Sequence, residues 1–389
     1  MPTLIENENN TAAIQPALIL IPDISGFTEY MYNSDNIHCR YIIAELLETI
    51  LDSNQLELSV SELEGDAVLF YKFGKPPSLE EIIAQCNLIF TNFHRYIKQF
   101  SFDTLCDCSC CKTAINLSIK FIVHYGKVSP VTVKTHDKLF GSDVILAHRL
   151  LKNNIEEPEY ILLSDTYLKT QDKSELNKLI DWNKIEKGEM DYKHLGTVQY
   201  YYIDVGKLKN KIDVREPSPP VEEGSSKVKF KIYIDTPPDF VRGIITNFKF
   251  KVNWITILQN IQFNERTIPR IGGKHKCLMG DMFIKPILID YQSVYINSER
   301  TVYIEKLSIK LITFNIYLSY NIKPKGLGTL LRLELNFAQK GFYPTLLMFF
   351  FSRKLSKRKI KTSLSKLKSL CEEVYNKYYL DKKHSSDFG

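Results

Sequence analysis

Residues 18–31 read LILIPDISGFTEYM, and residues 62–71 read ELEGDAVLFY. Each stretch is an apolar run with one aspartate beside a glycine, Asp23 in the first and Asp66 in the second. Apolar or alternating runs that break at glycine are typical of strands, so both carboxylates are expected at strand ends. Two such carboxylates can hold divalent metal ions, and a helix beginning just after Asp23 would offer backbone N–H groups to phosphates. The pair therefore predicts a site for metal-assisted phosphate chemistry.

The first half of the chain alternates between strand and helix patterns. The expected elements are a strand at 17–24, a helix at 38–53, a hairpin at 56–74, a helix at 79–100, a strand pair at 117–133 broken at Tyr125-Gly126, a helix at 141–152, and strands at 159–164 and 198–205. This β-α-β-β-α-β order, with later additions, predicts an α+β fold with a ferredoxin-like sheet and helices on one face.

A change in composition predicts two domains. Residues 207–226 are polar and rich in proline, serine and charge, which is typical of a linker. The predicted parts are a disordered N-terminus at 1–15, a first domain at 16–206, the linker at 207–226, a second domain at 227–380 and a tail at 381–389.

The second domain shows a different order of elements. A strand at 228–234 and two short helices precede strands from about 258 to 340, and a long amphipathic helix begins near Phe342. This order predicts an antiparallel sheet that grips one helix, with an apolar pocket between them that includes Trp254 and Tyr295. We expect a cavity above about 300 Å³, the lower end for ligand pockets. The alternative is that these aromatic residues belong to a solid core.

Composition and charge argue against some classes of function for this chain, namely nucleic-acid binding, secretion and membrane spanning. The chain has 389 residues, a net charge of +6 and eight cysteines. It lacks a basic stripe interleaved with aromatic residues, so nucleic acid is not an expected partner. The N-terminal MPTLIENENNTAAIQP has no signal-peptide pattern, and no apolar run is long enough to span a membrane. We expect a cytoplasmic protein with reduced thiols and no disulfide scaffold.

The cysteine-rich stretch CDCSCC at 106–111 is a second chemical signal. Cys106, Cys108 and Cys111 offer three neighbouring thiolates, which suit tetrahedral zinc. The fourth ligand would be Cys110, a distant residue or another subunit, and the alternative is a thiol-rich loop without metal. The histidines at 38, 124 and 148 are expected to be packed or hydrogen-bonded rather than catalytic.

These motifs resemble known families. PDISGFT and EGDAVLF resemble the two metal-binding motifs of class III nucleotidyl cyclases, and HYGKV (124–128) and KLFGSDVILAHRL (138–150) resemble later segments of that domain. The resemblance covers roughly residues 16–205. It is closest to an uncharacterised bacterial branch in which such a domain is joined to a START-like, polyketide-cyclase-like (SRPBCC) domain, and the second half resembles that partner by pattern. The resemblance implies a ferredoxin-like cyclase homology domain followed by a helix-grip domain, and a homodimer.

The resemblance assigns roles to individual residues. The metal positions are Asp23, Ile24 and Asp66, with Mg²⁺ or Mn²⁺ as the ion; the nucleotide-binding positions are Ser25, Gly26, Phe27, Thr28, Glu62 and Lys138; and the transition-state arginine is Arg149. The chain departs from the family at two polar catalytic positions, where Ile145 and Leu195 stand. Each lost group of this kind costs about 10²–10³ in rate.

Three hypotheses follow. The leading one is a cytoplasmic signalling or sensor protein. Its first domain binds a nucleoside triphosphate with a divalent metal and cyclises it weakly or not at all, and its START-like domain binds a hydrophobic small molecule or lipid. The second is an active cyclase that uses GTP or ATP and is regulated by the C-terminal domain. The third is a dimerising scaffold in which the apolar pocket is the one binding site.

Overall fold

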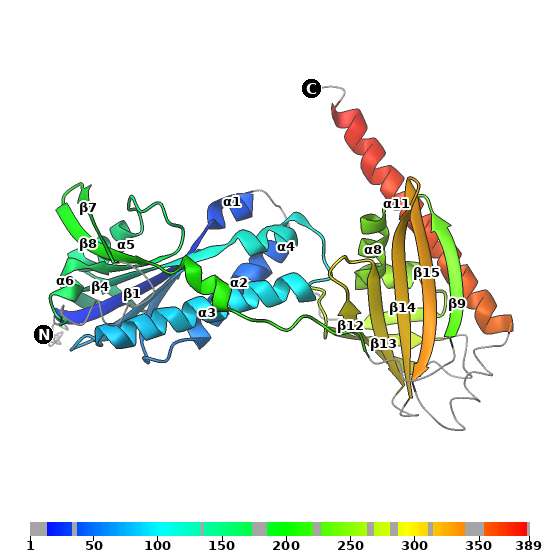
Figure 1. Cartoon of the computed structure of the whole chain (residues 1–389), viewed down its shortest axis with the longest axis horizontal. Coiled ribbons are helices and arrows are strands. Elements are labelled where there is room, and N and C mark those ends of the chain that lie inside the picture. Colours follow the sequence, from blue (N-terminus) through cyan, green and yellow to red (C-terminus); the bar gives the residue numbers. More distant parts are fainter. Residues whose placement is uncertain are drawn as a thin grey trace, which may run out of the picture. The chain divides into compact units, whose positions relative to one another are not determined.

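The computed structural model describes residues 14–32, 37–133, 136–172, 185–220, 227–262, 268–280, 287–309, 314–338 and 354–386. The chain forms two compact units (Figure 1). The first consists of Met1–Lys98 and Thr113–Val214, and the second consists of Gln99–Lys112 and Arg215–Gly389. Both units combine helices with largely antiparallel sheets, as the predicted α+β class requires.

The first unit is built on an eight-stranded sheet among its described residues. The strands are β1 (Gln15–Ser25), β2 (Ser59–Glu64), β3 (Ala67–Phe73), β4 (Ser118–Val133), β5 (His136–Phe140), β6 (Tyr160–Ser164), β7 (Glu186–Tyr192) and β8 (Gly196–Asp204). The helices are α1 (Phe27–Tyr32), α2 (Ile37–Asp52), α3 (Leu79–Asp103), α4 (Ser109–Thr113), α5 (Ser142–Leu150) and α6 (Asp165–Leu168), with short 3₁₀ turns η1 (Ala114–Asn116) and η3 (Gly206–Lys211). The strand order is β2-β3-β1-β4-β6-β8-β7, and β5 pairs with β4.

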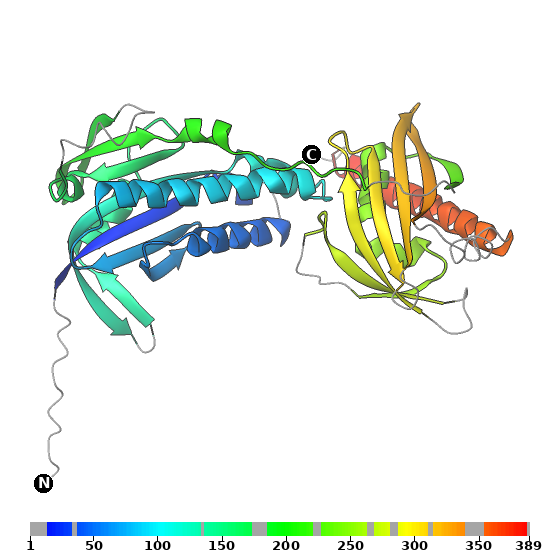
Figure 2. The ribbon, with the colours of Figure 1, turned by 60° about the horizontal axis from the view of Figure 1, so that its bottom comes forward.

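Strand β1 lies at the centre of this sheet, between β3 and β4. A central strand covered on both faces is apolar throughout, which explains the run LILI. On one face, Ala17 and Ile19 pack in a cluster with Val144 and Ala147 of α5. Residues on the opposite face, such as Leu18, are also fully buried, and Figure 2 shows α2 and α3 running along the sheet. The expectation of helices on one face is therefore wrong.

Strand β4 differs from what the sequence predicted. It is one continuous strand, Ser118–Val133, rather than a pair broken at Tyr125-Gly126. Gly126 pairs with Ala17 inside the ladder. A Cβ atom at this glycine would lie 2.2 Å from Cγ of Asp143, so the glycine makes room for that side chain rather than for a turn. Strands β5 and β7 were not expected from the sequence.

The second unit contains a seven-stranded antiparallel sheet among its described residues. Its elements are β9 (Lys227–Ile234), α8 (Pro238–Thr246), α9 (Phe248–Trp254), β10 (Leu258–Gln262), β11 (Lys274–Met279), β12 (Ile287–Ile296), β13 (Val302–Ile309), β14 (Phe314–Lys325), β15 (Gly328–Ala338) and α11 (Lys354–Ser386). The strand order is β10-β11-β12-β13-β14-β15-β9, so β9, the first strand of this unit along the chain, pairs with β15, the last. The predicted helix start near Phe342 lies outside the described residues.

Local sequence explains the two short helices. Proline occupies the first position of α8, where its missing N–H removes no helical hydrogen bond. Asn247 ends α8 and caps α9, because its side chain accepts a hydrogen bond from Lys249 N at 3.0 Å. The apolar faces of α8, α9 and α11 join the inner face of the sheet in one core that includes Val241, Trp254 and Leu367.

Two further expectations can be compared with the described residues. None of their helices is both long enough and apolar enough to cross a membrane. Two cysteines, Cys39 and Cys110, are disulfide-bonded, so the expectation that all thiols are reduced is wrong for them. The free cysteines are Cys86, Cys106, Cys108, Cys111, Cys277 and Cys371.

Candidate functional site

Strand pairing brings the two motif aspartates together. β1 and β3 are antiparallel, and Asp23 stands opposite Ala67, the residue after Asp66. The backbone N–H of Ile24 donates to the carbonyl oxygen of Asp66 at 3.1 Å, which ties the two segments together. Gly65 has φ +63°, so the turn before Asp66 favours glycine. The carboxylates therefore lie at neighbouring strand ends.

The electrostatics of this pair favour a cation. The pKa of Asp66 is raised to about 6, first because burial penalises its charged form and next because the charge of Asp23 repels it. Lys120, opposite Asp23 on β4, places its Nζ 3.1 Å from Oδ2 of that aspartate. Nothing in the local sequence marks Lys120, since only the register of β1 and β4 makes it a neighbour. A divalent ion between the carboxylates would relieve their repulsion.

The segment after Asp23 has the expected local form. β1 ends at Ser25, Gly26 has φ +86°, and α1 begins at Phe27. Tyr30 N donates to the carbonyl oxygen of Gly26 at 3.0 Å, and Thr28 is exposed in the first turn. α1 has six residues. Phosphate binding by this segment stays a prediction.

Two of the predicted nucleotide-binding residues, Glu62 and Lys138, contact each other. Nζ of Lys138 lies 3.3 Å from Oε2 of Glu62, and Nε2 of His148 lies 3.3 Å from Oε1 of the same carboxylate. Glu64 lies beside Glu62 and His148. One possible ligand atom from each of these three residues lies within 4.8 Å of the other two. Both oxygens of Glu62 thus contact basic side chains within this chain. Nucleotide binding by Glu62 stays a prediction.

The remaining family positions are Arg149, Ile145 and Leu195. Arg149 is an exposed residue in the last turn of α5. Ile145, on the same helix, is 56% exposed, which is unusual for isoleucine. Leu195 lies in the turn between β7 and β8, where it packs against a core cluster. Neither apolar side chain can donate or accept a hydrogen bond at its position.

A buried hydrogen-bonded chain was missed by sequence reasoning. Nε2 of His124 contacts Oδ1 of Asp143 at 3.0 Å, and Nδ1 contacts Oγ of Ser164 at 3.0 Å. This order resembles a hydrolytic triad, but Ser164 is 1% exposed and also caps α6 by accepting from Tyr167 N. A nucleophile has to reach its substrate, so the chain is structural. It agrees with the expectation of a hydrogen-bonded histidine.

The second unit has an apolar cavity between its sheet and α11. Its walls include Trp254, Tyr291, Tyr320, Ile360 and Leu364, and its volume is about 100 Å³. The predicted wall residue Tyr295 is not among the described residues that line it. The expectation of a cavity above about 300 Å³ is therefore wrong for this conformation.

A buried ion pair lies in the same unit and was not expected. Lys251 and Glu305 are both fully buried, and their charged groups are in direct contact. Tyr303 donates to the carboxylate at 2.8 Å. Burial and the charge of Lys251 lower the pKa of His275 to about 2, so this imidazole is neutral. The sequence did contain one sign of this ion pair. Glu305 is a charged residue at an inward-facing position of β13, between the buried residues Tyr303 and Leu307.

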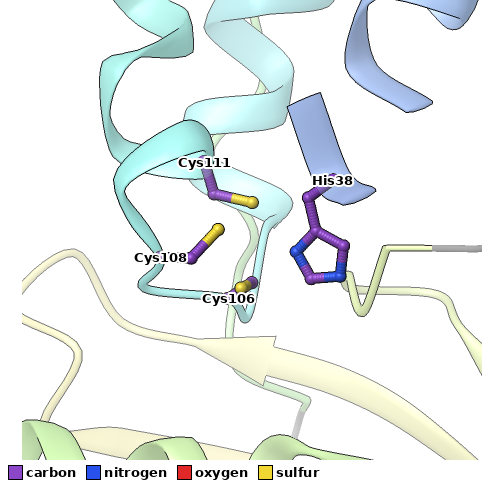
Figure 3. A group of neighbouring side chains, drawn as sticks. All are labelled: His38, Cys106, Cys108 and Cys111. Atoms are coloured by element: carbon purple, nitrogen blue, oxygen red, sulfur yellow. The ribbon is translucent and has the colours of Figure 1, made fainter. Parts of the chain in front are cut away.

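The three predicted zinc ligands lie together. Figure 3 shows the side chains of Cys106, Cys108 and Cys111 with their sulfur atoms directed into one space. Cys111 is buried, and the other two are half-buried. All three are free cysteines on the short segment that follows α3.

Comparisons with known sequences relate this chain to proteins without an assigned function. A family described as Protein of unknown function (DUF2652) matches residues 43–160. The uncharacterized protein Rv2561/Rv2562 of Mycobacterium tuberculosis (strain ATCC 25618 / H37Rv) is 32% identical over 172 residues. The matched region covers 42% of this chain and 73% of the mycobacterial protein.

Comparisons with solved structures find similarities that each cover half of the chain or less. The guanylate cyclase domain of RhGC from Catenaria anguillulae, in complex with GTP, is 20% identical with a TM-score of 0.34, covering 49% of this chain and 96% of that chain. The adenylyl cyclase CyaB from P. aeruginosa is 16% identical with a TM-score of 0.33, covering 49% and 94%. TTHA0849 from Thermus thermophilus is 15% identical with a TM-score of 0.31, covering 38% and 99%.

Proposed function

This chain belongs to the same family as the uncharacterized protein Rv2561/Rv2562 of Mycobacterium tuberculosis, and because that relative carries no assigned activity, we propose a function from the site itself. The first unit binds a nucleoside triphosphate through Mg²⁺ or Mn²⁺ held by Asp23 and Asp66. The observation that carries the proposal is the pair of carboxylates at neighbouring strand ends, with the pKa of Asp66 raised to about 6 by burial and by Asp23. A polyanion bridged by a divalent ion relieves that repulsion.

Lys120 sets the affinity of this site for metal. Its ammonium group lies 3.1 Å from Oδ2 of Asp23 and therefore contacts the carboxylate that would coordinate the metal ion. Binding of the metal requires this ion pair to open, after which the ammonium group is available to a phosphate oxygen. The variant Lys120→Met should therefore bind Mn²⁺ more tightly and nucleoside triphosphate less tightly than the wild type. Equal changes in both affinities would contradict this role.

Cyclisation is expected to be weak or absent. Ile145 and Leu195 are apolar at positions where the resembled family has polar groups that stabilise the transition state. Incubation with ATP or GTP and Mn²⁺ or Mg²⁺, followed by product analysis, separates the outcomes. Metal-dependent binding without product supports the proposal, cyclic product supports an active cyclase, and absence of binding supports the scaffold hypothesis.

The second unit is proposed to bind a small hydrophobic molecule. The supporting observation is the almost entirely apolar wall of the cavity, one side of which is formed by Ile360, Ser363 and Leu364 of α11. A volume of about 100 Å³ admits a ligand of a few carbon atoms, so a larger ligand requires α11 to move. Native mass spectrometry of the purified chain tests this proposal, which fails if no lipid or added alkane adds mass.

The proposed location and assembly rest on the sequence. A cytoplasmic location and a homodimer remain proposals, and size-exclusion chromatography with light scattering tests the second.

A further inference from the structure

The first half of α11 carries a dense run of basic residues. Residues 354–370 read KLSKRKIKTSLSKLKSL, which contains seven basic residues and no acidic residue. The first acidic side chain of this helix is Glu372. Basic residues are unfavourable near the N-terminus of a helix, because the macrodipole is positive there. The run therefore opposes the stability of its own helix and needs another explanation.

The basic residues lie on a helix with two different sides. α11 packs against α8, α9 and β9 of the same unit. Its buried residues Leu364, Leu367 and Cys371 recur at helical spacing and belong to the core of that unit. The exposed residues on the other side form a set that we call the basic face: Lys357, Arg358, Lys361, Thr362, Ser365, Lys366 and Ser369. Every charged member of this face is positive.

The charges of the basic face are not neutralised by this chain. Among the residues that the structure describes, its four basic side chains form no ion pair with a carboxylate. By contrast, Nζ of Lys368, farther along the helix, lies 3.6 Å from Oε1 of Glu372. Lys357 and Lys361 are four residues apart, so their like charges repel each other on the helix surface. Such a face is complementary to an anionic partner.

The chemistry of the basic face favours a lipid surface over nucleic acid. Three of its four charges are lysines, which act as flexible point charges, whereas arginine is preferred where phosphate is recognised by paired hydrogen bonds. None of its members is aromatic, so none can stack on a base. Clusters of four to eight basic residues on an amphipathic helix are typical of segments that bind anionic lipid headgroups.

The same helix forms part of the wall of the apolar cavity. Lys359, Ile360 and Leu364 line that cavity, and Lys359 directly follows Arg358 of the basic face. The basic face and the cavity wall therefore adjoin along the first turns of α11. A molecule that is poorly soluble in water is concentrated in lipid bilayers, so contact with a bilayer at this helix would bring such a molecule next to the cavity. This last step rests on the hydrophobic ligand proposed above, but docking itself does not.

We propose that the second unit docks on an anionic lipid bilayer through the basic face of α11. The helix lies along the surface of the bilayer and does not cross it, which agrees with its charged outer side. Each lysine near such a surface contributes about fivefold in affinity, and salt screens the attraction over a distance of about 8–10 Å. Docking is independent of the proposed nucleotide site, because the two share no residue.

Cosedimentation of the full-length chain with lipid vesicles tests the proposal. The vesicles consist of phosphatidylcholine, with or without phosphatidylserine. We expect binding that requires phosphatidylserine and weakens as the salt concentration rises. The double variant Lys357→Gln/Lys361→Gln should bind about 25-fold more weakly than the wild type, since it lacks two of the charges. Its melting temperature should not fall, because the change removes a pair of like charges from an exposed helix surface.

The matched control removes two exposed lysines from the other side of the sheet. Lys274 and Lys276 of β11 alternate with His275 and Cys277, which are buried on the side that faces the core. Lys274→Gln/Lys276→Gln has the same net charge as the test variant and should bind vesicles as the wild type does. An equal loss in both double variants would mean that net charge alone drives binding, and it would overturn the proposal.

Three further outcomes complete the test. Equal binding to vesicles with and without phosphatidylserine would overturn the proposal. So would tight binding of duplex DNA that depends on Lys357 and Lys361 in a chain that binds no vesicles, because this result would assign the basic face to nucleic acid. Binding to phosphatidylserine vesicles by a chain that takes up no hydrophobic molecule would support docking, and it would contradict only the ligand proposed for the cavity.

Discussion

Replacing Asp66 by asparagine should make the metal-free protein more stable near neutral pH. The pKa of this carboxyl is raised from 3.8 to about 6, so the charged form of Asp66 lowers the stability of the folded state. A shift of about 2 units corresponds to roughly 3 kcal/mol, at about 1.4 kcal/mol per unit. Because the group is only half-buried, solvent screening reduces this to about 1 kcal/mol. An asparagine at this position carries no charge and therefore avoids the cost.

The pH dependence of this effect has a defined sign. A raised folded-state pKa means that the stability linked to Asp66 is fully present below its unfolded pKa of 3.8. That stability is lost as the pH rises through about 6. Asp66→Asn and wild type should therefore unfold at similar temperatures near pH 4. Near pH 7.5 the variant should melt about 2–4 °C higher.

Thermal unfolding in chelator, followed by circular dichroism, measures the difference at both pH values. Asp23→Asn is the matched control, because it removes the partner of Lys120 and should not raise the melting temperature. With Mn²⁺ at about 100 times its dissociation constant, wild type should gain about 2.7 kcal/mol, and Asp66→Asn should gain almost nothing. A variant that is less stable than wild type near pH 7.5, or a gain that persists near pH 4, would refute the reasoning.

Three other predictions concern separate features. Lys251→Met and Glu305→Gln should each lower the free energy of unfolding by about 3–5 kcal/mol, because each leaves a buried charge unpaired; the double variant should lose less than the sum in urea titrations. Gly126→Ala should lower the melting temperature, since the new methyl group overlaps Asp143; an unchanged value would show that Asp143 moves freely. Steady-state assays should find cyclic nucleotide formation well below about 10 s⁻¹, and a rate at that level would mean that other residues replace the missing polar groups.

Local sequence predicted the elements that depend on near neighbours. The strands around Asp23 and Asp66 follow from apolar runs that end at glycine, and α2 and α3 follow from their periodicity. The convergence of Cys106, Cys108 and Cys111 also follows from spacing, because all three lie within or next to one short turn. Weakly patterned segments are harder to predict: β5 and β7 are short and polar, and Gly126 suggests a turn although it lies inside a strand.

The sequence by itself therefore determined the chemical groups of both candidate sites and their nearest neighbours along the chain. Tertiary structure alone decided their partners from other elements. Lys120 meets Asp23 through the register of β4 on β1, and Glu305 meets Lys251 because one inward position of β13 faces α9. Such contacts join residues tens of positions apart, and no short-range periodicity encodes them. They are set by which strands pair and which faces are buried, and that is a property of the whole fold.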